Sequence, residues 1–481
     1  MKKYFILGLL LLEMSVSAQE LTLYECRQMA LENNRQQNVN KESVEAAKDL
    51  HRASVANFFP KLTLNGLYHW NEKSLCLMPN AMDFSFGSMN ADGTFTLKPI
   101  EMTDLSGNSF TFNPANYPKL NDAITKLIAN GYNDIRDMLK FDIHNVYLGS
   151  ATITQPIFLG GRLINATNMT KAAVALEEIK SEKSTGELIV SVDEAYWRVM
   201  TVESKYELAS SYLDLLKKLE HDVAELVGSG LATQGDLLKV KVKRQEAEVM
   251  QTEAENGLLL SKMALCQLCG LPLDSEIMLK ENGFADVVLV DSSMVSVDGR
   301  NEMKMLEQAK NIAHAGVNMS AAGLMPNIVA EASYYIMNPN VQNGFDNNFA
   351  GSFAAGVVVS IPIAHANDIY ALKAAKHKER VLDYQMEDVR DKLQLQIKQS
   401  EQALMLANRK LLQTNSSIES AEENLRYAEE LFGAGMISAT EMLQAQTAWL
   451  EAKSKRIEAA GDVRLAEVKY KMNTNQLAVE K

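Results

Sequence analysis

The sequence predicts a mainly α-helical chain that is internally duplicated and also carries a few short strands. Four long stretches contain no proline, as continuous helices require; they are residues 162–227, 233–270, 364–432 and 438–474. At about 1.5 Å per residue, the first of these helices would be roughly 100 Å long. No compact domain of this size accommodates such a rod, so the long helices favour an extended helical assembly.

The apolar residues of two of these helices recur with a strict 4-3 spacing. In the first helix the spacing runs from Leu188 to Leu216, and in the third it runs from Leu393 to Phe432. A seam that holds over several heptads is typical of coiled-coil packing rather than of a single helix on a globular core.

Two parts of the sequence resemble each other, and an internal repeat of this kind indicates the architecture more reliably than any single motif does. Residues 226–238 match residues 431–443 at an offset of 205, and both segments contain Gly-x-Gly before a new helix start. Gln155-Pro156-Ile157 matches Ile361-Pro362-Ile363 at an offset of 206. Two copies of one strand-and-helix unit are therefore expected.

Each repeat is predicted to hold two strands and two long helices. The first repeat spans residues 19–270, the second spans residues 301–475, a segment of its own covers 271–300, and a tail covers 476–481. The strands are expected at about 60–70 and 147–158 in the first repeat, and at about 326–338 and 351–362 in the second. Residues 71–146 form an insert between the first two strands.

The four predicted strands have the length and pattern of membrane strands. Each alternates in hydropathy over about ten residues, the length that a tilted strand needs to cross a bilayer, and aromatic residues lie near the ends. Four strands cannot close a barrel, and an open edge in lipid leaves backbone groups unpaired. Several copies of the chain would then share one barrel. A soluble four-stranded sheet that caps a helical bundle is the alternative.

The N-terminus has the features of a secretory signal. Lys2 and Lys3 precede the apolar run 4–12, and Val16-Ser17-Ala18 places small residues where a signal peptidase reads the chain. Residues 1–18 are therefore predicted to be a cleaved signal peptide. The alternative, a retained anchor, would need a longer apolar run.

Charge and cysteine content exclude several classes. The net charge of −13 provides no bulk positive field for nucleic acid. Cys266 and Cys269 are expected to be small packing residues at a helix end, and Cys26 and Cys76 are expected to be isolated. The histidines are scattered and no phosphate loop, metal motif or nucleophile elbow occurs, so we expect no enzyme, metal site or cofactor.

Both glycine segments are followed by helix N-cap signals. Thr233 precedes Asp236 by three residues, and Ser438 precedes Glu441 by three residues. This spacing is that of the capping box, for which Ser-x-x-Glu is the stronger match.

In the order of these motifs the sequence resembles the TolC-like outer-membrane efflux proteins over residues 20–475. The most specific parts are residues 155–162, which look like the strand-to-helix joint of that family, the two Gly-x-Gly tips, and the helix end at 268–272. The resemblance implies a homotrimer with a 12-stranded β-barrel in the outer membrane, continuous with a periplasmic α-helical coiled-coil barrel. It also implies an equatorial band built from 271–300 and the chain termini.

The resemblance further implies a passive exit duct for small molecules. Such a duct works with a periplasmic adaptor, or membrane fusion protein, and with an inner-membrane transporter that supplies the energy. The adaptor is expected to dock at the tips, at Gly228, Gly230, Leu231, Thr233, Gly433, Gly435, Met436 and Ser438. Glu441, Gln444 and Asp236 are expected at the periplasmic constriction, where a ring of carboxylates would favour cations. For Glu441, a role as helix cap alone remains open.

The sequence departs from the family pattern at two places. Phe432 and Ile437 stand where other members carry the partners of an acidic residue that holds the mouth closed, so that lock is not expected here. The second copy has residues 362–367 where a Gly-Gly joint would be expected.

Two alternative functions remain open at this point, and so does the role of the insert. The same architecture could serve as the outer-membrane duct of a type I protein secretion system. A soluble periplasmic coiled-coil adaptor or scaffold shares the heptads and the signal peptide, but normally has one hairpin. The insert 71–146, with a predicted helix at 119–140, is expected outside the cell, where it could fold over the barrel mouth.

Overall fold

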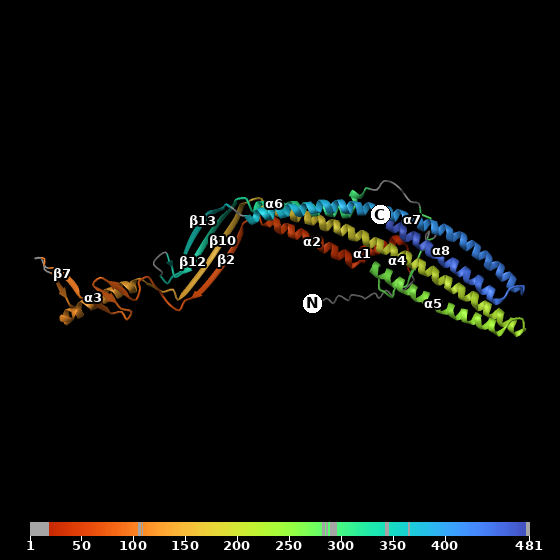
Figure 1. The fold of residues 1–481 in the computed structure, drawn as a ribbon, viewed down its shortest axis with the longest axis horizontal. Coiled ribbons are helices and arrows are strands. Elements are labelled where there is room, and N and C mark those ends of the chain that lie inside the picture. Colours follow the sequence, from red (N-terminus) through yellow and green to blue (C-terminus); the bar gives the residue numbers. More distant parts are fainter. Residues whose placement is uncertain are drawn as a thin grey trace, which may run out of the picture. The chain divides into compact units, whose positions relative to one another are not determined.

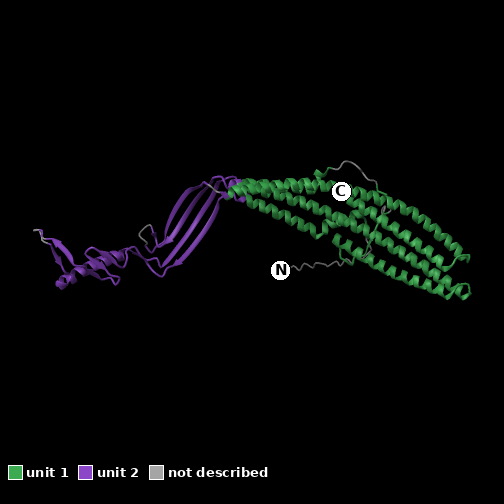
Figure 2. Ribbon diagram, in the orientation of Figure 1, with its two compact units in different colours: residues 1–54, 164–320, 367–481 green, residues 55–163, 321–366 purple. Residues whose placement is uncertain are grey.

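The fold was analysed in a computed structural model that describes residues 19–103, 107, 109–280, 284, 287–288, 296–341, 346–363 and 366–477. The predicted signal peptide 1–18, much of the segment 271–300 and the last residues of the tail lie outside the described residues. The chain divides into two compact units, which Figure 2 shows in different colours. Unit 1 is helical and comprises residues 1–54, 164–320 and 367–481, and unit 2 comprises residues 55–163 and 321–366.

Unit 1 consists mainly of long helices that run alongside one another (Figure 1). The helices are α1 (Leu23–Asn33), α2 (Arg35–Ala56), α4 (Arg162–Gly228), α5 (Gln234–Cys269), α6 (Asn301–Ala322), α7 (Ala366–Gly433) and α8 (Ala439–Asn473). The mainly helical prediction is confirmed. Helix α1 was not predicted, although Thr22 and Glu25 form a complete capping box at its start.

The two predicted seams are buried in unit 1. Along α4, Val192, Val199 and Leu216 are fully buried, and along α7 Leu404 and Leu411 are fully buried. These residues belong to two hydrophobic clusters, one of which includes the hairpin ends of α4, α5, α7 and α8. The 4-3 spacing therefore identified the packing faces of both helices correctly.

A short parallel pair ties the start of the described chain to the segment after α5. Strand β1 (Gln19–Leu21) pairs with β11 (Ile277–Leu279), and the amide of Lys280 donates to the Leu21 carbonyl over 3.0 Å. The Tyr196 hydroxyl on α4 donates to the Lys280 carbonyl over 2.7 Å. Residues 277–280 are thus held against both residues 19–21 and the long helix α4.

A buried ion pair joins α1 to α4. The Arg27 guanidinium donates to both carboxylate oxygens of Asp193, over 2.7 and 2.6 Å, and the Asp193 side chain is 1% exposed. Burial raises the pKa of the Asp193 carboxyl, and the hydrogen bonds from Arg27 oppose that rise. This bidentate geometry is the strongest that an arginine and a carboxylate form.

Cysteine packing differs from the prediction at one residue. Cys266 and Cys269 are free and fully buried at the end of α5, as expected of packing residues. The expectation that Cys26 is isolated is wrong, because the Cys269 thiol lies 3.6 Å from the Cys26 carbonyl oxygen. Helix α1 brings Cys26 there from a position 243 residues away, which sequence spacing could not show.

Glu467 on α8 links the stability of unit 1 to pH. Burial opposes its ionisation, but hydrogen bonds from Lys471 (2.6 Å) and Arg464 (2.8 Å) outweigh that and lower its pKa below the ordinary 4.5. Because the folded carboxyl holds its proton less tightly than the unfolded one, this contribution is complete above pH 4.5. It is lost as the pH falls through the lowered pKa.

We therefore expect the melting temperature of the wild type, followed by helical circular dichroism, to fall below pH 4.5 more steeply than that of Glu467→Gln. Other carboxylates titrate in both proteins, so the difference between them isolates Glu467. Parallel curves for the two proteins from pH 7 down to pH 3 would show that Glu467 plays no such part.

Unit 2 is built on one antiparallel four-stranded sheet with the order β13-β12-β10-β2 (Figure 1). Its strands are β2 (Lys61–Trp70), β10 (Asn145–Leu159), β12 (Asn327–Asn338) and β13 (Ala350–Ser360). β10 starts two residues before its predicted beginning, and β13 ends before Pro362, which has no amide proton for a ladder. β2 and β13 are the edges of this sheet.

Glycine forms the joint between β10 and α4. Gly160 and Gly161 have φ values of +61° and +84°, which other residues rarely adopt. A Cβ at Gly160 would also lie 2.7 Å from the Ala322 carbonyl oxygen and from Met325 Cβ. The joint after β10 therefore needs glycine, whereas Ala364 and His365, at the predicted equivalent joint, lie outside the described residues.

The insert folds as a small structure of its own within unit 2. Its described residues form α3 (Pro118–Met138) and seven short strands: β3 (Leu75–Cys76), β4 (Met82–Phe84), β5 (Gly87–Met89), β6 (Phe95–Leu97), β7 (Ile100–Thr103), β8 (Ser109–Phe112) and β9 (Lys140–Phe141). Its core consists of Met89, Phe95, Ala129 and Tyr132. The Tyr132 hydroxyl donates to the Pro79 carbonyl over 2.9 Å. The helix was predicted, but the short strands were not.

Candidate functional sites: the sheet faces and the hairpin tips

One face of the unit 2 sheet is apolar across all four strands. Strand pairing places Leu64, Ala151, Tyr334 and Phe353 in one row across the sheet, and Leu62, Ile153, Ala332 and Ala355 in the next row on the same face. Leu64 is 74% exposed and Phe353 is 68% exposed. A continuous exposed apolar face of this kind marks an interaction with lipid or protein.

The opposite face of the sheet is polar. The row between the two apolar rows consists of Thr63, Thr152, Ser333 and Ala354, and the neighbouring row consists of Lys61, Thr154, Glu331 and Gly356. The Ser333 hydroxyl donates to the Thr152 hydroxyl oxygen across the strands over 3.0 Å. Alternation of apolar and polar residues with a period of two is the pattern of strands that face lipid on one side and water on the other.

Aromatic rings gather at the end of the sheet from which the insert departs. Tyr68 and Tyr147 are cross-strand partners with ring centroids 5.0 Å apart, and Phe349 lies 6.0 Å from Tyr147. The Tyr68 hydroxyl donates to the Asn145 side-chain oxygen over 2.9 Å. Rings that combine an apolar body with a polar tip are typical of the headgroup level of a bilayer.

In unit 1, the two hairpin tips have the same backbone geometry. Gly230 and Gly435 have φ values of +74° and +72°, and the amides that follow them close the turn identically. The Leu231 amide donates to the Leu226 carbonyl, and the Met436 amide donates to the Leu431 carbonyl, each over 2.8 Å. Because left-handed residues at helix ends are usually glycine, this bond pattern explains one glycine in each tip.

The other tip residues differ in what they require. Gly228 and Gly433 have no positive φ and no atom within 4 Å of a would-be Cβ, so the turn itself does not need glycine there. Leu231 is 78% exposed and Met436 is 73% exposed. Each tip therefore presents one large apolar side chain that is mostly uncovered by the described residues.

Helix capping after the tips follows the sequence pattern. Ser438 and Glu441 form the complete capping box, in which the Ser438 amide and hydroxyl donate to the Glu441 carboxylate over 2.7 and 2.9 Å. In the first copy, Thr233 accepts from the Asp236 amide over 3.2 Å. The stronger match predicted for the second copy is therefore confirmed.

Two of the three predicted constriction residues lie at the start of α8, and the third, Asp236, lies at the start of α5. Glu441 and Gln444 are both exposed and lie one turn apart. The backbone and side-chain hydrogen bonds from Ser438 lower the pKa of Glu441, so its carboxylate stays charged near neutral pH. Within the described ranges, Glu441 has no ion pair with a basic side chain.

Asp236 is partly neutralised by a lysine that sequence reasoning missed. The Lys239 ammonium lies 3.3 Å from the Asp236 carboxylate and 3.3 Å from the Thr440 hydroxyl oxygen. Hydrogen bonds from Thr233 and Lys239 lower the pKa of Asp236. Lys239 thus bridges the two hairpins, and the sequence signal for its ion pair is its position three residues after Asp236.

The aromatic and aliphatic residues that depart from the family pattern serve as packing residues. Phe432 and Ile437 are partly buried against the cluster that includes Leu216 and Trp449. Between α5 and α8 beside this cluster lies an open groove of about 810 Å³, lined by Leu238, Val242 and Leu443 among others. The second tip is therefore held by hydrophobic packing.

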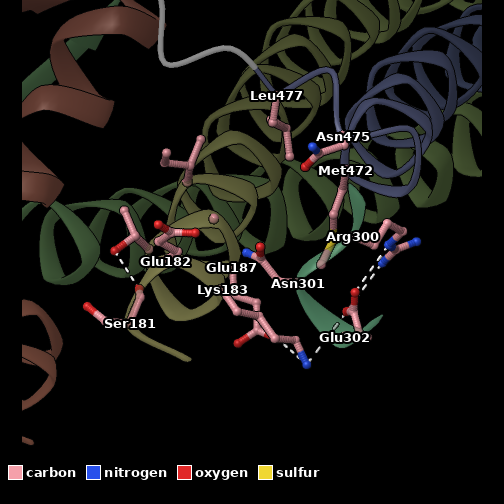
Figure 3. Close-up of a pocket in the computed structure, with 13 residues that line it drawn as sticks. Ser181, Glu182, Lys183, Glu187, Arg300, Asn301, Glu302, Met472, Asn475 and Leu477 are labelled. Carbon is pink, nitrogen blue, oxygen red and sulfur yellow. Dashed lines mark hydrogen bonds and ion pairs between the residues drawn. The ribbon is translucent and has the colours of Figure 1, made fainter. Parts of the chain in front are cut away.

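A second hollow of about 350 Å³ lies where the end of α8 meets residues 300–302 and α4. Figure 3 shows Arg300, Glu302 and Lys183 linked in it. Arg300 Nε donates to Glu302 over 3.2 Å, Arg300 also donates to the Asn473 carbonyl over 3.2 Å, and Lys183 lies 3.7 Å from Glu302. Because these charged groups pair with one another, they hold residues 300–302 against α4 and the end of α8.

Among the described residues, no helix combines the length and the apolar content needed to cross a membrane. In the same part of the chain, no group of three or more His, Cys, Asp or Glu side chains could hold a metal ion.

Comparisons with known proteins identify the family. The family model described as outer membrane efflux protein matches residues 135–271 and 297–469. No curated protein matches the chain. Among solved structures, the chain is similar to CusC, whose crystal structures concern folding and transmembrane channel formation, with a TM-score of 0.70 at 14% identity over 94% of this chain and 91% of that one.

Two further structures have the same fold. The outer membrane protein VceC of Vibrio cholerae gives a TM-score of 0.66 at 13% identity, over 94% of this chain and 95% of that chain. The open state of the MtrE outer membrane channel of Neisseria gonorrhoeae gives 0.68 at 14% identity, over 94% and 88%. Because the family match spans well over half of the chain, the chain belongs to the outer membrane efflux protein family.

Proposed function

We propose that this chain is the outer-membrane exit duct of a tripartite efflux pump that exports small molecules. Three copies would contribute four strands each to a 12-stranded barrel, and their long helices would enclose a periplasmic tunnel. A periplasmic adaptor would connect the duct to an inner-membrane transporter that supplies the energy.

The observation that carries this proposal is the unit 2 sheet. It has an exposed apolar face, a polar face, and two edges, β2 and β13, without a neighbouring strand among the described residues. In lipid, each unpaired backbone group costs several kcal/mol, and closure by identical copies would pair the groups along both edges. A soluble adaptor would have no use for such a sheet, which disfavours that alternative.

We also propose the two-repeat organisation, with repeats 19–270 and 301–475 around an equatorial segment 271–300. Its support is the shared tip geometry at Gly230 and Gly435 and the paired capping at Thr233 and Ser438. The β1–β11 pair and the Arg300 hydrogen bond to Asn473 support an equatorial band that includes both ends of the mature chain.

The adaptor is proposed to dock at the two tips. Leu231 and Met436 offer exposed apolar contacts at equivalent positions, while Gly228 and Gly433 let a partner backbone approach closely because no side chain covers them. Thr233, Ser438, Gly230 and Gly435 shape the turns that present these contacts.

Membrane fractionation tests the proposed location. The protein expressed in a Gram-negative host should remain in the outer-membrane pellet after washing with carbonate at high pH, because strands that cross the bilayer resist extraction. Recovery of the protein in the wash would instead favour the soluble scaffold.

Glu441 is proposed to set the charge preference of the periplasmic constriction. Three carboxylates near one axis favour cations, and Glu441 is the better candidate because Asp236 is already paired with Lys239. Glu441→Gln keeps the capping hydrogen bond, since glutamine also completes a capping box, and removes the charge. The cation-to-anion permeability ratio, measured from reversal potentials in a planar bilayer, should fall.

Glu451→Gln, ten residues further along α8 in the groove that Gln444 also lines, is the matched control for the loss of one carboxylate and should lower this ratio much less. If Glu441→Gln behaves like that control, Glu441 serves as a helix cap only.

A further inference from the structure

Helix α3 of the insert carries an apolar seam that the described residues leave exposed. One side of the helix packs on the insert core through Ala129 and Tyr132. The other side exposes four large apolar residues, with exposed fractions of 50% at Leu120, 74% at Leu127, 53% at Ile135 and 79% at Met138.

The exposed seam has the spacing of a helix–helix interface. Leu120, Ile124, Leu127, Gly131, Ile135 and Met138 follow one another at intervals of four, three, four, four and three residues. Intervals of three and four that persist over five steps are the pattern of a coiled-coil face. Charged residues flank it, and the Lys126–Asp122 ion pair of 2.9 Å lies beside the seam.

Gly131 in the middle of this seam has no role in the fold of the single chain. Its φ is not positive, and a Cβ built there would meet no atom within 4 Å. A glycine inside a helix costs about 1 kcal/mol relative to alanine. At a helix–helix interface the same residue lets two backbones approach closely, which gives Gly131 a function that the isolated chain does not provide.

The connections of α3 identify the helix that covers this seam. The insert leaves the edge strand β2 at Trp70 and rejoins the sheet at Asn145, and only residues 71–74 and 142–144 separate it from the strands. Since β2 and β13 are the open edges, copies that close the sheet into a ring must place their inserts at the same end and beside one another. The inserts of neighbouring copies are therefore within reach of one another at that end of the sheet.

We infer that the α3 helices of three copies pack against one another through this seam and form a helical cap at the outer end of the duct. This inference rests on the proposed trimer. It assigns the insert a partner, a second copy of the same segment, and predicts that the cap narrows the outer mouth.

Cysteine cross-linking in the full-length protein tests the contact. Cys76→Ser removes the half-buried thiol of the insert, and the other three native thiols are fully buried. In that background, Leu127→Cys and Met138→Cys should each give a covalent dimer on a denaturing gel after treatment with a short bismaleimide, because one cysteine per chain can link only two copies. Lys126→Cys, next to Leu127 and off the seam, is the matched control and should stay monomeric.

The oligomer is measured on the same samples by native mass analysis in detergent. Two outcomes would overturn the cap and leave the proposed duct intact. In the first, the protein is trimeric but neither Leu127→Cys nor Met138→Cys is cross-linked. In the second, the protein is trimeric but Lys126→Cys is cross-linked as strongly as they are. Absence of trimers would overturn both.

Gly131→Leu supplies a second readout. Gly131 is exposed and a Cβ there has no atom within 4 Å, so the insert should fold, whereas the larger side chain should hold the seams of neighbouring copies apart. The single-channel conductance should then rise, as it should when residues 75–142 are deleted. Unchanged conductance in Gly131→Leu trimers would contradict a cap closed through Gly131.

Discussion

Replacing Ala355 with arginine should abolish stable insertion of the protein in the outer membrane. Ala355 lies at the middle of β13 on the apolar face, in the row that contains Leu62, Ile153 and Ala332. An arginine that faces lipid at the bilayer midplane costs about 2–4 kcal/mol, and a trimer would carry that cost three times. The amount of carbonate-resistant protein in the outer-membrane fraction measures the effect.

Ala354→Arg is the matched control, because it changes the same residue type one position away on the same exposed strand. Ala354 shares the polar face with Thr63, Thr152 and Ser333, where an arginine would meet water. We expect Ala354→Arg to insert like the wild type. Equal loss in both variants, or no loss in either, would contradict the assignment of the two faces.

Replacing Asp193 with leucine should destabilise unit 1 by about 3–5 kcal/mol, because it leaves the Arg27 guanidinium partly buried without its carboxylate. Arg27 is 20% exposed, so some of its charge can still reach water. The measurement is denaturant unfolding at pH 7, followed by the helical circular dichroism signal.

The double variant Arg27→Met with Asp193→Leu separates loss of the pair from loss of packing. The double variant also removes the guanidinium that has lost its carboxylate, so it should be more stable than Asp193→Leu alone. A double variant that is as unstable as Asp193→Leu would show that the pair acts through packing of its side chains.

Much of the fold could be predicted because its main elements repeat a simple local pattern. The absence of proline and the 4-3 spacing located α4 and α7, and the residues in both seams are shielded from solvent. Alternation over about ten residues located β2, β10, β12 and β13 to within a few residues. The Ser-x-x-Glu spacing identified the capping box at Ser438, since that bond needs only residues three apart.

What could not be predicted depends on contacts between distant segments. The contact of Cys26 with Cys269 and the pair of Arg27 with Asp193 join residues far apart in sequence, and α1, which provides both, has only a weak apolar period. Lys239 could not be linked to Thr440 until the two hairpins were placed side by side. The short strands of the insert, of two to four residues, are below the length at which alternation can be recognised.

The central claim is that identical copies close the open sheet edges of this chain around a water-filled passage. The most direct test is to determine the number of copies in the detergent-purified particle and its conductance in a planar bilayer. We predict three copies per particle and a stable ion conductance. Single-copy particles that conduct no ions would contradict the account.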